Sequence, residues 1–238
     1  PMRSKESVSG QLTNDLATDP AAQLDAYASL ILASNQKAGL MSSGTSRDDL
    51  YQRHFPESFA VLAALESNNL LNSPVIDIGS GAGLPGVPLK IARPGIGITL
   101  LEATQKKAAF LGEVVQELRL TDVTVIRGRA EEIGRDPLHR ERYRLAVARS
   151  VAPLPVLLEL ALPLLAVGGV LAAVKGSRME AEIDASANAL ATLGGAVEVT
   201  LRLEIPLPGP PMLVIVRKVA ETPDAFPRRP GMPNKRPL

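Results

Sequence analysis

The sequence contains neither cysteine nor tryptophan among its 238 residues. Without cysteine, disulfides, thiolate metal sites and thiol nucleophiles are all excluded. Aromatic residues make up only 3% of the chain, so its core must be built from leucine, valine, isoleucine and alanine. Charge of one sign is not in excess, since the formal net charge is +1, and overall charge gives no argument for binding nucleic acid. Apolar residues (45%) and charged residues (21%) occur in the proportions of an ordinary globular protein.

Uninterrupted hydrophobic runs of membrane-spanning length are also missing. The apolar stretch Leu154–Leu171 is interrupted by Pro155, Glu159 and Pro163, which predicts a buried helix followed by a buried strand. The sequence shows no basic segment followed by an apolar one, so no signal peptide is predicted. We therefore expect a cytoplasmic, monomeric protein that uses neither a membrane nor a metal ion.

The pattern along the chain predicts three parts: a helical N-terminal extension over residues 1–72, an α/β domain over 73–219, and a basic, proline-rich tail over 220–238. Within the α/β domain, short apolar runs alternate with amphipathic segments, which indicates a mostly parallel sheet with helices on both faces. Strands are expected at 75–78, 98–101, 123–126, 145–148 and 170–174, and helices at 84–92, 105–118, 130–133, 156–165 and 180–193.

The end of the α/β domain differs from its beginning. Two extended runs, 196–205 and 212–219, are joined by Pro206–Pro211 without a helix, so they must pair antiparallel. Five strand–helix units followed by a hairpin predict the seven-stranded, Rossmann-like sheet of the class I methyltransferases, preceded here by a small helical region. A plain dinucleotide-binding fold would more often continue with another helix.

A glycine-rich segment follows the first strand and fits two patterns. Gly79, Gly81 and Gly83 have the spacing of methyltransferases, whereas Gly81, Gly83 and Gly86 have the spacing of the dinucleotide fingerprint. Asp77 favours the first pattern, because an acid there can orient the loop and attract the amino group of a methionine moiety. The terminal hairpin and the lack of a second domain agree. We therefore expect the domain 73–219 to bind S-adenosyl-L-methionine, with a nicotinamide-dependent oxidoreductase as the alternative.

Charged residues stand where the next strands end. Glu102 ends the second strand, where a carboxylate can accept the hydroxyls of a ribose. Glu131, beside Ala130, follows the third strand, at the corner that faces adenine in this fold. Arg149 and Lys175 end the fourth and fifth strands, on the edge where ligands of open sheets bind. Glu102, Ala130 and Glu131 are predicted to bind the cofactor, and Arg149 and Lys175 are predicted to be catalytic. For each of the charged residues, the alternative is a side chain that contacts only solvent.

Residues that the sequence lacks also limit which atom the protein can methylate. Methylation of pyrimidine C5 ordinarily needs a cysteine, and the Asn/Asp-Pro-Pro-Tyr/Phe box that serves exocyclic amines is replaced by Arg149–Pro153. Guanine N7 has a free lone pair and no proton to lose, so it needs alignment rather than a general base. Positioning can supply about 7–11 kcal/mol of the barrier. This favours base-independent, in-line transfer to guanine N7, with another RNA atom, a protein or a small molecule as alternative acceptors.

The segment from Asp77 to Leu89 resembles the signature of the glucose-inhibited division protein B family, bacterial small-subunit ribosomal RNA guanine-N7 methyltransferases. The similarity covers roughly residues 25–238 and includes Leu100–Glu102, Arg129–Glu132 and Arg53–Ser58. It departs from the family at 39–41, where Gly-Leu-Met replaces Asn-Leu-Thr, and at Glu57, where aspartate is usual.

This resemblance implies a set of functional residues. Cofactor contacts are expected at Gly79, Leu84, Ala130, Glu131 and Arg149. Contacts with the guanine and its RNA are expected at Arg53, His54, Ser58, Arg129, Arg149 and Lys175. The implied partner is small-subunit ribosomal RNA or a ribosomal particle. A ribosome-binding module that has lost catalysis is the non-enzyme alternative, which the intact Asp77 and Glu102 disfavour.

The tail carries a local excess of positive charge. Arg228, Arg229, Lys235 and Arg236 lie in a segment without acidic residues. Its prolines are expected to prevent a helix and to keep the segment extended, so that its charges can follow an RNA backbone. The alternative is a solvated tail that contacts no partner.

Overall fold

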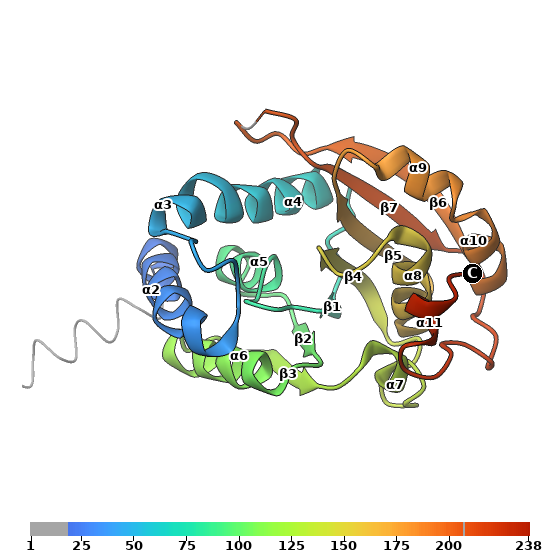
Figure 1. Ribbon diagram of the computed structural model, residues 1–238, viewed down its shortest axis with the longest axis horizontal. Helices are drawn as coiled ribbons and strands as arrows, with labels where there is room; N and C mark the ends of the chain where they lie inside the picture. The colour runs from blue at the N-terminus through green and yellow to red at the C-terminus, as the bar shows by residue number, and fades with distance from the viewer. Residues whose placement is uncertain (1–18, 207) are drawn as a thin grey trace, which may run out of the picture.

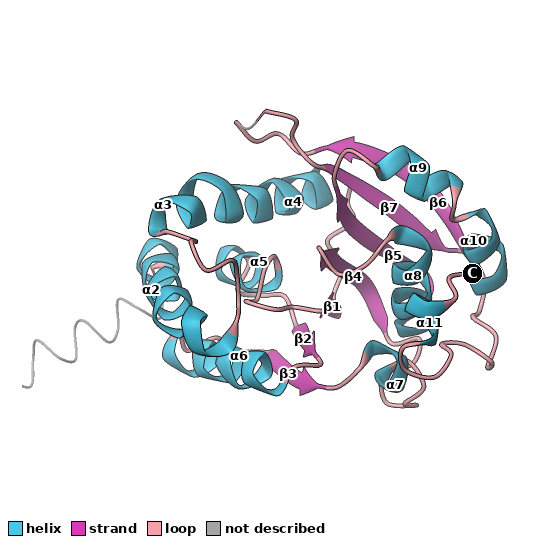
Figure 2. Cartoon of the chain, viewed as in Figure 1, coloured by secondary structure: helices cyan, strands magenta, loops and turns pink. Residues whose placement is uncertain are grey.

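A computed structural model describes residues 19–206 and 208–238, and the first part of the predicted N-terminal extension, residues 1–18, lies outside the described residues. The chain forms a seven-stranded sheet in the order β3-β2-β1-β4-β5-β7-β6 (Figure 2). The strands are β1 (Val75–Ile78), β2 (Ile98–Glu102), β3 (Val123–Arg127), β4 (Tyr143–Arg149), β5 (Leu165–Lys175), β6 (Gly195–Arg202) and β7 (Met212–Lys218).

The first five strands pair parallel, and β7 lies antiparallel between β5 and β6. This arrangement confirms the predicted class I methyltransferase sheet with its terminal hairpin. The carboxyl ends of β1, β2, β3, β4 and β5 therefore meet at one edge of the sheet, where open α/β sheets bind their ligands.

Helices cover both faces of the sheet (Figure 1). They are α2 (Pro20–Ala38), α3 (Arg47–Asp49), the π-helix η1 (Leu50–His54), α4 (Phe55–Ser67), α5 (Gly86–Ala92), α6 (Gln105–Glu117), α7 (Ala130–Ile133), α8 (Leu154–Ala161), the 3-10 turn η2 (Leu162–Leu164), α9 (Met179–Asp184), α10 (Ala187–Leu193) and α11 (Met232–Lys235). Successive strand residues point to opposite faces. Leu145 and Val147 of β4 thus join the core under α2, α4, α5 and α6, whereas Ala146 and Ala148 join the core under α8 and α10.

The N-terminal helices belong to the same core as the sheet. Tyr27 of α2 and Phe55 of α4 are buried in one hydrophobic cluster with Leu100 of β2 and Val147 of β4. The two rings stack with their centroids 5.6 Å apart. The predicted helical region is therefore packed against one face of the sheet and can carry residues to its ligand edge. Within the described ranges, no helix combines the length and the hydropathy needed to cross a membrane.

Two predicted helices are interrupted. The helix expected over 156–165 gives way to the turn η2 at Leu162, because Pro163 lacks a backbone N–H and cannot continue it. The helix expected over 180–193 is two helices, α9 and α10, with Ser186 between them. The hydroxyl of Ser186 donates to the carbonyl of Glu182 at 2.6 Å, a local bond that competes with the helical ladder.

The C-terminal segment corrects another prediction. The expectation that its prolines prevent a helix is wrong, because α11 spans Met232–Lys235 with Pro233 in its first turn, where no N–H is needed. The segment also packs on the domain, and Phe226 and Leu238 contact the core around α8. In Figure 1, α11 lies beside α8.

Candidate functional site

The glycine loop at the end of β1 has a backbone that only glycine adopts easily. Gly79, Gly81 and Gly83 have φ angles of +66°, +58° and +94°. A Cβ on Gly83 would lie 2.6 Å from Val87 Cγ2, so this glycine is needed for packing. A Cβ on Gly81 would meet no described atom nearer than the Gly79 oxygen at 3.8 Å, so a ligand can approach the backbone there.

Asp77 lies beneath this loop and is fully buried. Its Oδ2 accepts a hydrogen bond of 3.1 Å from the backbone N–H of Gly86, at the start of α5. A Cβ on Gly86 would come within 2.6 Å of the same oxygen. The close approach to Asp77 thus explains why position 86 is a glycine, so this residue does not require a dinucleotide-binding role. Oδ1 has no hydrogen-bond partner in the described part of the chain, and burial raises the pKa of Asp77 to about 7.

Glu102 braces the loop from the end of β2. Its Oε2 accepts from the backbone N–H of Gly81 at 2.9 Å, and its Oε1 accepts from that of Thr104 at 2.7 Å. Tyr27 braces the loop from α2, because its hydroxyl donates to the carbonyl of Ala82 at 2.6 Å. The loop is therefore held on both sides by side chains of the protein itself.

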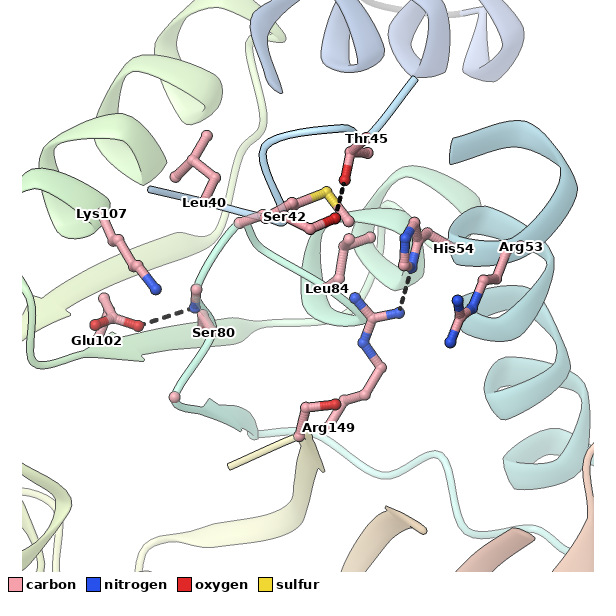
Figure 3. Close-up of a pocket in the computed structure, with 15 residues that line it drawn as sticks. Leu40, Ser42, Thr45, Arg53, His54, Ser80, Leu84, Glu102, Lys107 and Arg149 are labelled. Atoms are coloured by element: carbon pink, nitrogen blue, oxygen red, sulfur yellow. Dashed lines mark hydrogen bonds between the residues drawn. The ribbon is translucent and has the colours of Figure 1, made fainter. Parts of the chain in front are cut away.

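Two cavities open at this edge of the sheet and share Gly79 and Glu102. The first cavity has a volume of about 460 Å³, and the close-up in Figure 3 shows Arg149, His54 and Glu102 around it. It is lined by Leu40, Met41, Ser42, Thr45, Arg53, His54, Gly79, Ser80, Gly81, Ala82, Leu84, Glu102, Lys107, Arg149 and Ser150. The second cavity, of about 200 Å³, includes the predicted residues Arg129, Ala130 and Glu131 among its lining.

Residues 40–45 cover the first cavity and were not predicted as site residues. The side chain of Asn35 holds this segment: its Nδ2 donates to the carbonyl of Ser42 at 3.0 Å, and its Oδ1 accepts from the N–H of Met41 at 2.8 Å. The segment begins after Gly39, which ends α2 in the left-handed conformation. The helix end at Gly39 and the departure from the family pattern at residues 39–41 were the available sequence features, but neither reveals which surface the following chain covers.

Arg149, at the end of β4, contacts two residues from the N-terminal helices. Its NH1 donates to Nδ1 of His54 at 3.2 Å and to Oε1 of Glu57 at 3.1 Å. Because arginine only donates, Nδ1 must accept, and we assign the imidazole proton to Nε2. Burial, followed by the charges of Arg149 and Arg53, lowers the pKa of His54 to about 4. His54 is therefore neutral near pH 7.

The predicted residues Ser58 and Lys175 have structural contacts. The Ser58 hydroxyl donates to the His54 carbonyl at 2.9 Å and is almost fully buried. Lys175 lines neither of these two cavities. Its ammonium lies 2.8 Å from Glu182 Oε2 and donates to the Ala152 carbonyl at 2.7 Å. It thereby fixes the loop after β4, in which Ser150 has a left-handed φ of +57°. Its catalytic role stays a prediction.

The basic residues of the C-terminal segment differ in their contacts. Arg228 forms an ion pair of 2.5 Å with Oε2 of Glu159, whose side chain is 1% exposed. Arg229, Lys235 and Arg236 are exposed. The predicted set is therefore divided into one docking residue and three residues that are free to meet a partner.

Comparison with known proteins identifies the family. Residues 21–205 match the family described as rRNA small subunit methyltransferase G, GidB. The chain belongs to this family. A ribosomal RNA small subunit methyltransferase G from Pelotomaculum thermopropionicum is 42% identical, over 91% of this chain and 90% of that protein. Another, from Roseiflexus castenholzii, is 45% identical over 91% of both chains.

Membership of the rRNA small subunit methyltransferase G family confirms the resemblance and the methyltransferase interpretation over the oxidoreductase alternative. A solved SAM dependent methyltransferase from Aquifex aeolicus matches with a TM-score of 0.53 at 18% identity, over 73% of this chain and 94% of that chain. At this identity the match shows the shared fold. In the described residues, no group of three or more histidine, aspartate or glutamate side chains is arranged to hold a metal ion.

Proposed function

We propose that this protein transfers a methyl group from S-adenosyl-L-methionine to N7 of a guanine in small-subunit ribosomal RNA. One observation carries the choice of N7: among the described residues lining the first cavity, no side chain is arranged to take up a proton. Both oxygens of Glu102 accept backbone N–H groups. His54 has its Nδ1 bonded to Arg149 and a pKa lowered to about 4, mainly by burial. N7 carries a lone pair and no proton, so this site suits it without a general base.

The residues present fit S-adenosyl-L-methionine, which supplies an electrophilic methyl group when bound. The open position at Gly81 lets a ligand approach the loop backbone. Glu102 lines both cavities, where its carboxylate can accept a ribose hydroxyl while it braces the loop. Ala130 and Glu131 line the second cavity, which suits the adenine. The buried Asp77 Oδ1 beneath the loop is an acceptor that favours a cationic amino group nearby.

The RNA would meet positive charge on both sides of this edge. Arg53 and Arg149 line the first cavity and Arg129 lines the second, so they can contact phosphates beside the target guanine. Arg229, Lys235 and Arg236 extend the positive surface along the C-terminal segment. This positive surface supports ribosomal RNA, free or in a ribosomal particle, as the partner. From that partner we infer that the protein works in the cytoplasm.

Mass mapping of methylated nucleosides tests the proposal. Small-subunit ribosomal RNA from cells lacking this protein should lack one 7-methylguanosine that is present in cells containing it. The purified protein with S-adenosyl-L-methionine should restore that nucleoside in vitro, and NAD should not bind in calorimetry. Restoration of methyl at another atom would contradict the choice of N7, and tight NAD binding would contradict the choice of cofactor.

A further inference from the structure

A third cavity lies beside the first one and shares Arg53 with it. We call it the proline cavity; its volume is about 420 Å³, and its other lining residues are Glu57, Gly176, Pro208, Gly209 and Pro211. It is enclosed by residues of η1 and α4, the end of β5, and the connection between β6 and β7. In Figure 1 this connection projects past α4.

Glu57 is the acidic residue of the proline cavity and is only 8% exposed. Its Oε1 accepts from NH1 of Arg149 at 3.1 Å. Because Arg149 lines the first cavity and Glu57 lines the proline cavity, their ion pair forms the partition between the two. Arg149 holds Oε1, so Oε2 stays available to a ligand in the proline cavity.

A buried carboxylate that faces a base-sized cavity selects among nucleobases by its chemistry. An ionised carboxylate only accepts hydrogen bonds. Guanine presents two adjacent donors, N1–H and the N2 amino group, on its Watson–Crick edge. Adenine and cytosine each place an acceptor in the middle of that edge, and uracil places carbonyls on both sides of its single donor. Guanine is therefore the base whose edge best matches Glu57.

We propose that Glu57 is a specificity residue, which accepts hydrogen bonds from the Watson–Crick edge of the target guanine in the proline cavity. N7 lies on the Hoogsteen edge, which adjoins the Watson–Crick edge, and it is turned toward the first cavity where the two cavities meet at Arg53. Pro208 and Pro211 provide apolar surface for the face of the base, as enzymes that extract a base commonly do. Arg53, at the junction, contacts the phosphate or the sugar. This inference rests on the proposed function.

A base analogue tests the proposal directly. Once the methylated position is mapped, substrate RNA is prepared with guanosine or inosine there; inosine keeps N1–H and N7 but lacks the N2 amino group. At saturating S-adenosyl-L-methionine, we expect kcat/KM of the wild-type protein for inosine RNA to fall roughly ten- to a hundredfold, as for loss of a hydrogen bond to a charged group. This measurement does not depend on the folding of any variant.

Three variants assign that preference to Glu57. Glu57→Gln should methylate guanosine RNA slowly and lose most of the preference over inosine, because an amide presents donors as well as an acceptor. Glu57→Asp keeps a carboxylate and should retain the preference. Glu66→Gln, on the same helix but paired with the exposed Arg93, is the matched control and should behave as wild type.

Each outcome decides the proposal. Equal use of guanosine and inosine by the wild-type protein would overturn it. A Glu57→Gln variant that slows both substrates equally and keeps the preference would show a merely structural role and would also overturn it. Absence of 7-methylguanosine from guanosine RNA with the wild-type protein would instead refute the proposed function, and this inference with it.

Discussion

The backbone N–H of Gly231 donates a 3.0 Å hydrogen bond to Oε1 of Glu131. Glu131 lines the second cavity, so this bond ties the C-terminal segment to the wall of the proposed cofactor site. Arg228 fastens the same segment to α8 through Glu159. The segment therefore both supports that wall and exposes basic residues, and mutations can separate these two roles.

Removing the exposed positive charges should weaken RNA binding without changing cofactor affinity. Replacing Arg229, Lys235 and Arg236 together by serine should weaken RNA binding and flatten the plot of log affinity against log salt by about 0.7–0.9 per lost phosphate contact. Affinity for S-adenosyl-L-methionine should stay unchanged, because the Gly231–Glu131 bond uses only backbone on the segment side. Binding titrations at several salt concentrations measure the slope, and Arg93→Ser is the control. A slope that does not change would mean that these residues contact no phosphate.

Substitution of Arg228 should instead lower both the stability of the protein and its affinity for the cofactor. Arg228→Ala leaves the buried Glu159 carboxylate without its ion-pair partner, which costs about 3–5 kcal/mol in comparable cases. We expect a lower free energy of unfolding and weaker binding of S-adenosyl-L-methionine, because the segment that contacts Glu131 loses its anchor. Denaturant unfolding and calorimetry measure the two effects. The double variant Arg228→Met/Glu159→Met should recover much of the stability, and an unaffected Arg228→Ala protein would contradict the docking contact.

Substitution of Glu102 should weaken binding of the cofactor. Glu102→Ala removes the carboxylate that can accept a ribose hydroxyl, and loss of charge-assisted hydrogen bonds should weaken S-adenosyl-L-methionine binding by about 1.5–3 kcal/mol. It also releases the N–H of Gly81, so the loop should be less well held. Calorimetry on the folded variant measures the affinity, with Glu113→Ala on the exposed face of α6 as control. Wild-type affinity in Glu102→Ala would refute its role.

Local sequence patterns predicted the sheet and the glycine loop, because both follow from short apolar runs and from nearby glycines. Contacts between distant segments were not predictable in this way. His54 and Arg149 are 95 positions apart, and Gly231 and Glu131 are 100 positions apart. The cover of the first cavity by residues 40–45 likewise depends on how α2 packs on the sheet. Proline content misled the prediction for the tail, since Pro233 lies in the first turn of a helix there rather than preventing one.

The rate of methyl transfer should hardly depend on pH. If N7 attacks without a general base, the single-turnover rate at saturating substrates should be nearly flat between about pH 6.5 and 8.5. His54 does not change its protonation state in this pH range, because burial lowers its pKa to about 4. Rapid-quench measurements across this range check the expectation. A log-linear rise of the rate with pH would reveal a deprotonation step and would indicate a different acceptor atom.

Cofactor affinity, unlike the rate, should depend on pH through Asp77. Burial raises the pKa of Asp77 to about 7 from an ordinary value of 3.8. The folded protein thus keeps a proton that the unfolded chain has released, so this group makes the free energy of unfolding fall as pH rises from about 4 to 7. A cationic ligand favours the ionised carboxylate. Affinity for S-adenosyl-L-methionine should therefore rise between about pH 6 and pH 8, by at most roughly tenfold for linkage to one proton.

Asp77→Asn tests this assignment, because its amide oxygen can still accept from the N–H of Gly86 while the charge is lost. The variant should bind S-adenosyl-L-methionine more weakly at pH 8 than the wild type and with little dependence on pH. Its unfolding free energy should also lose the decline between about pH 4 and 7 that the buried carboxyl causes. Asp184→Asn, at an exposed position in α9, should keep both wild-type profiles. A wild-type affinity that is equal at pH 6 and pH 8 would show that the charge of Asp77 does not act on the bound cofactor.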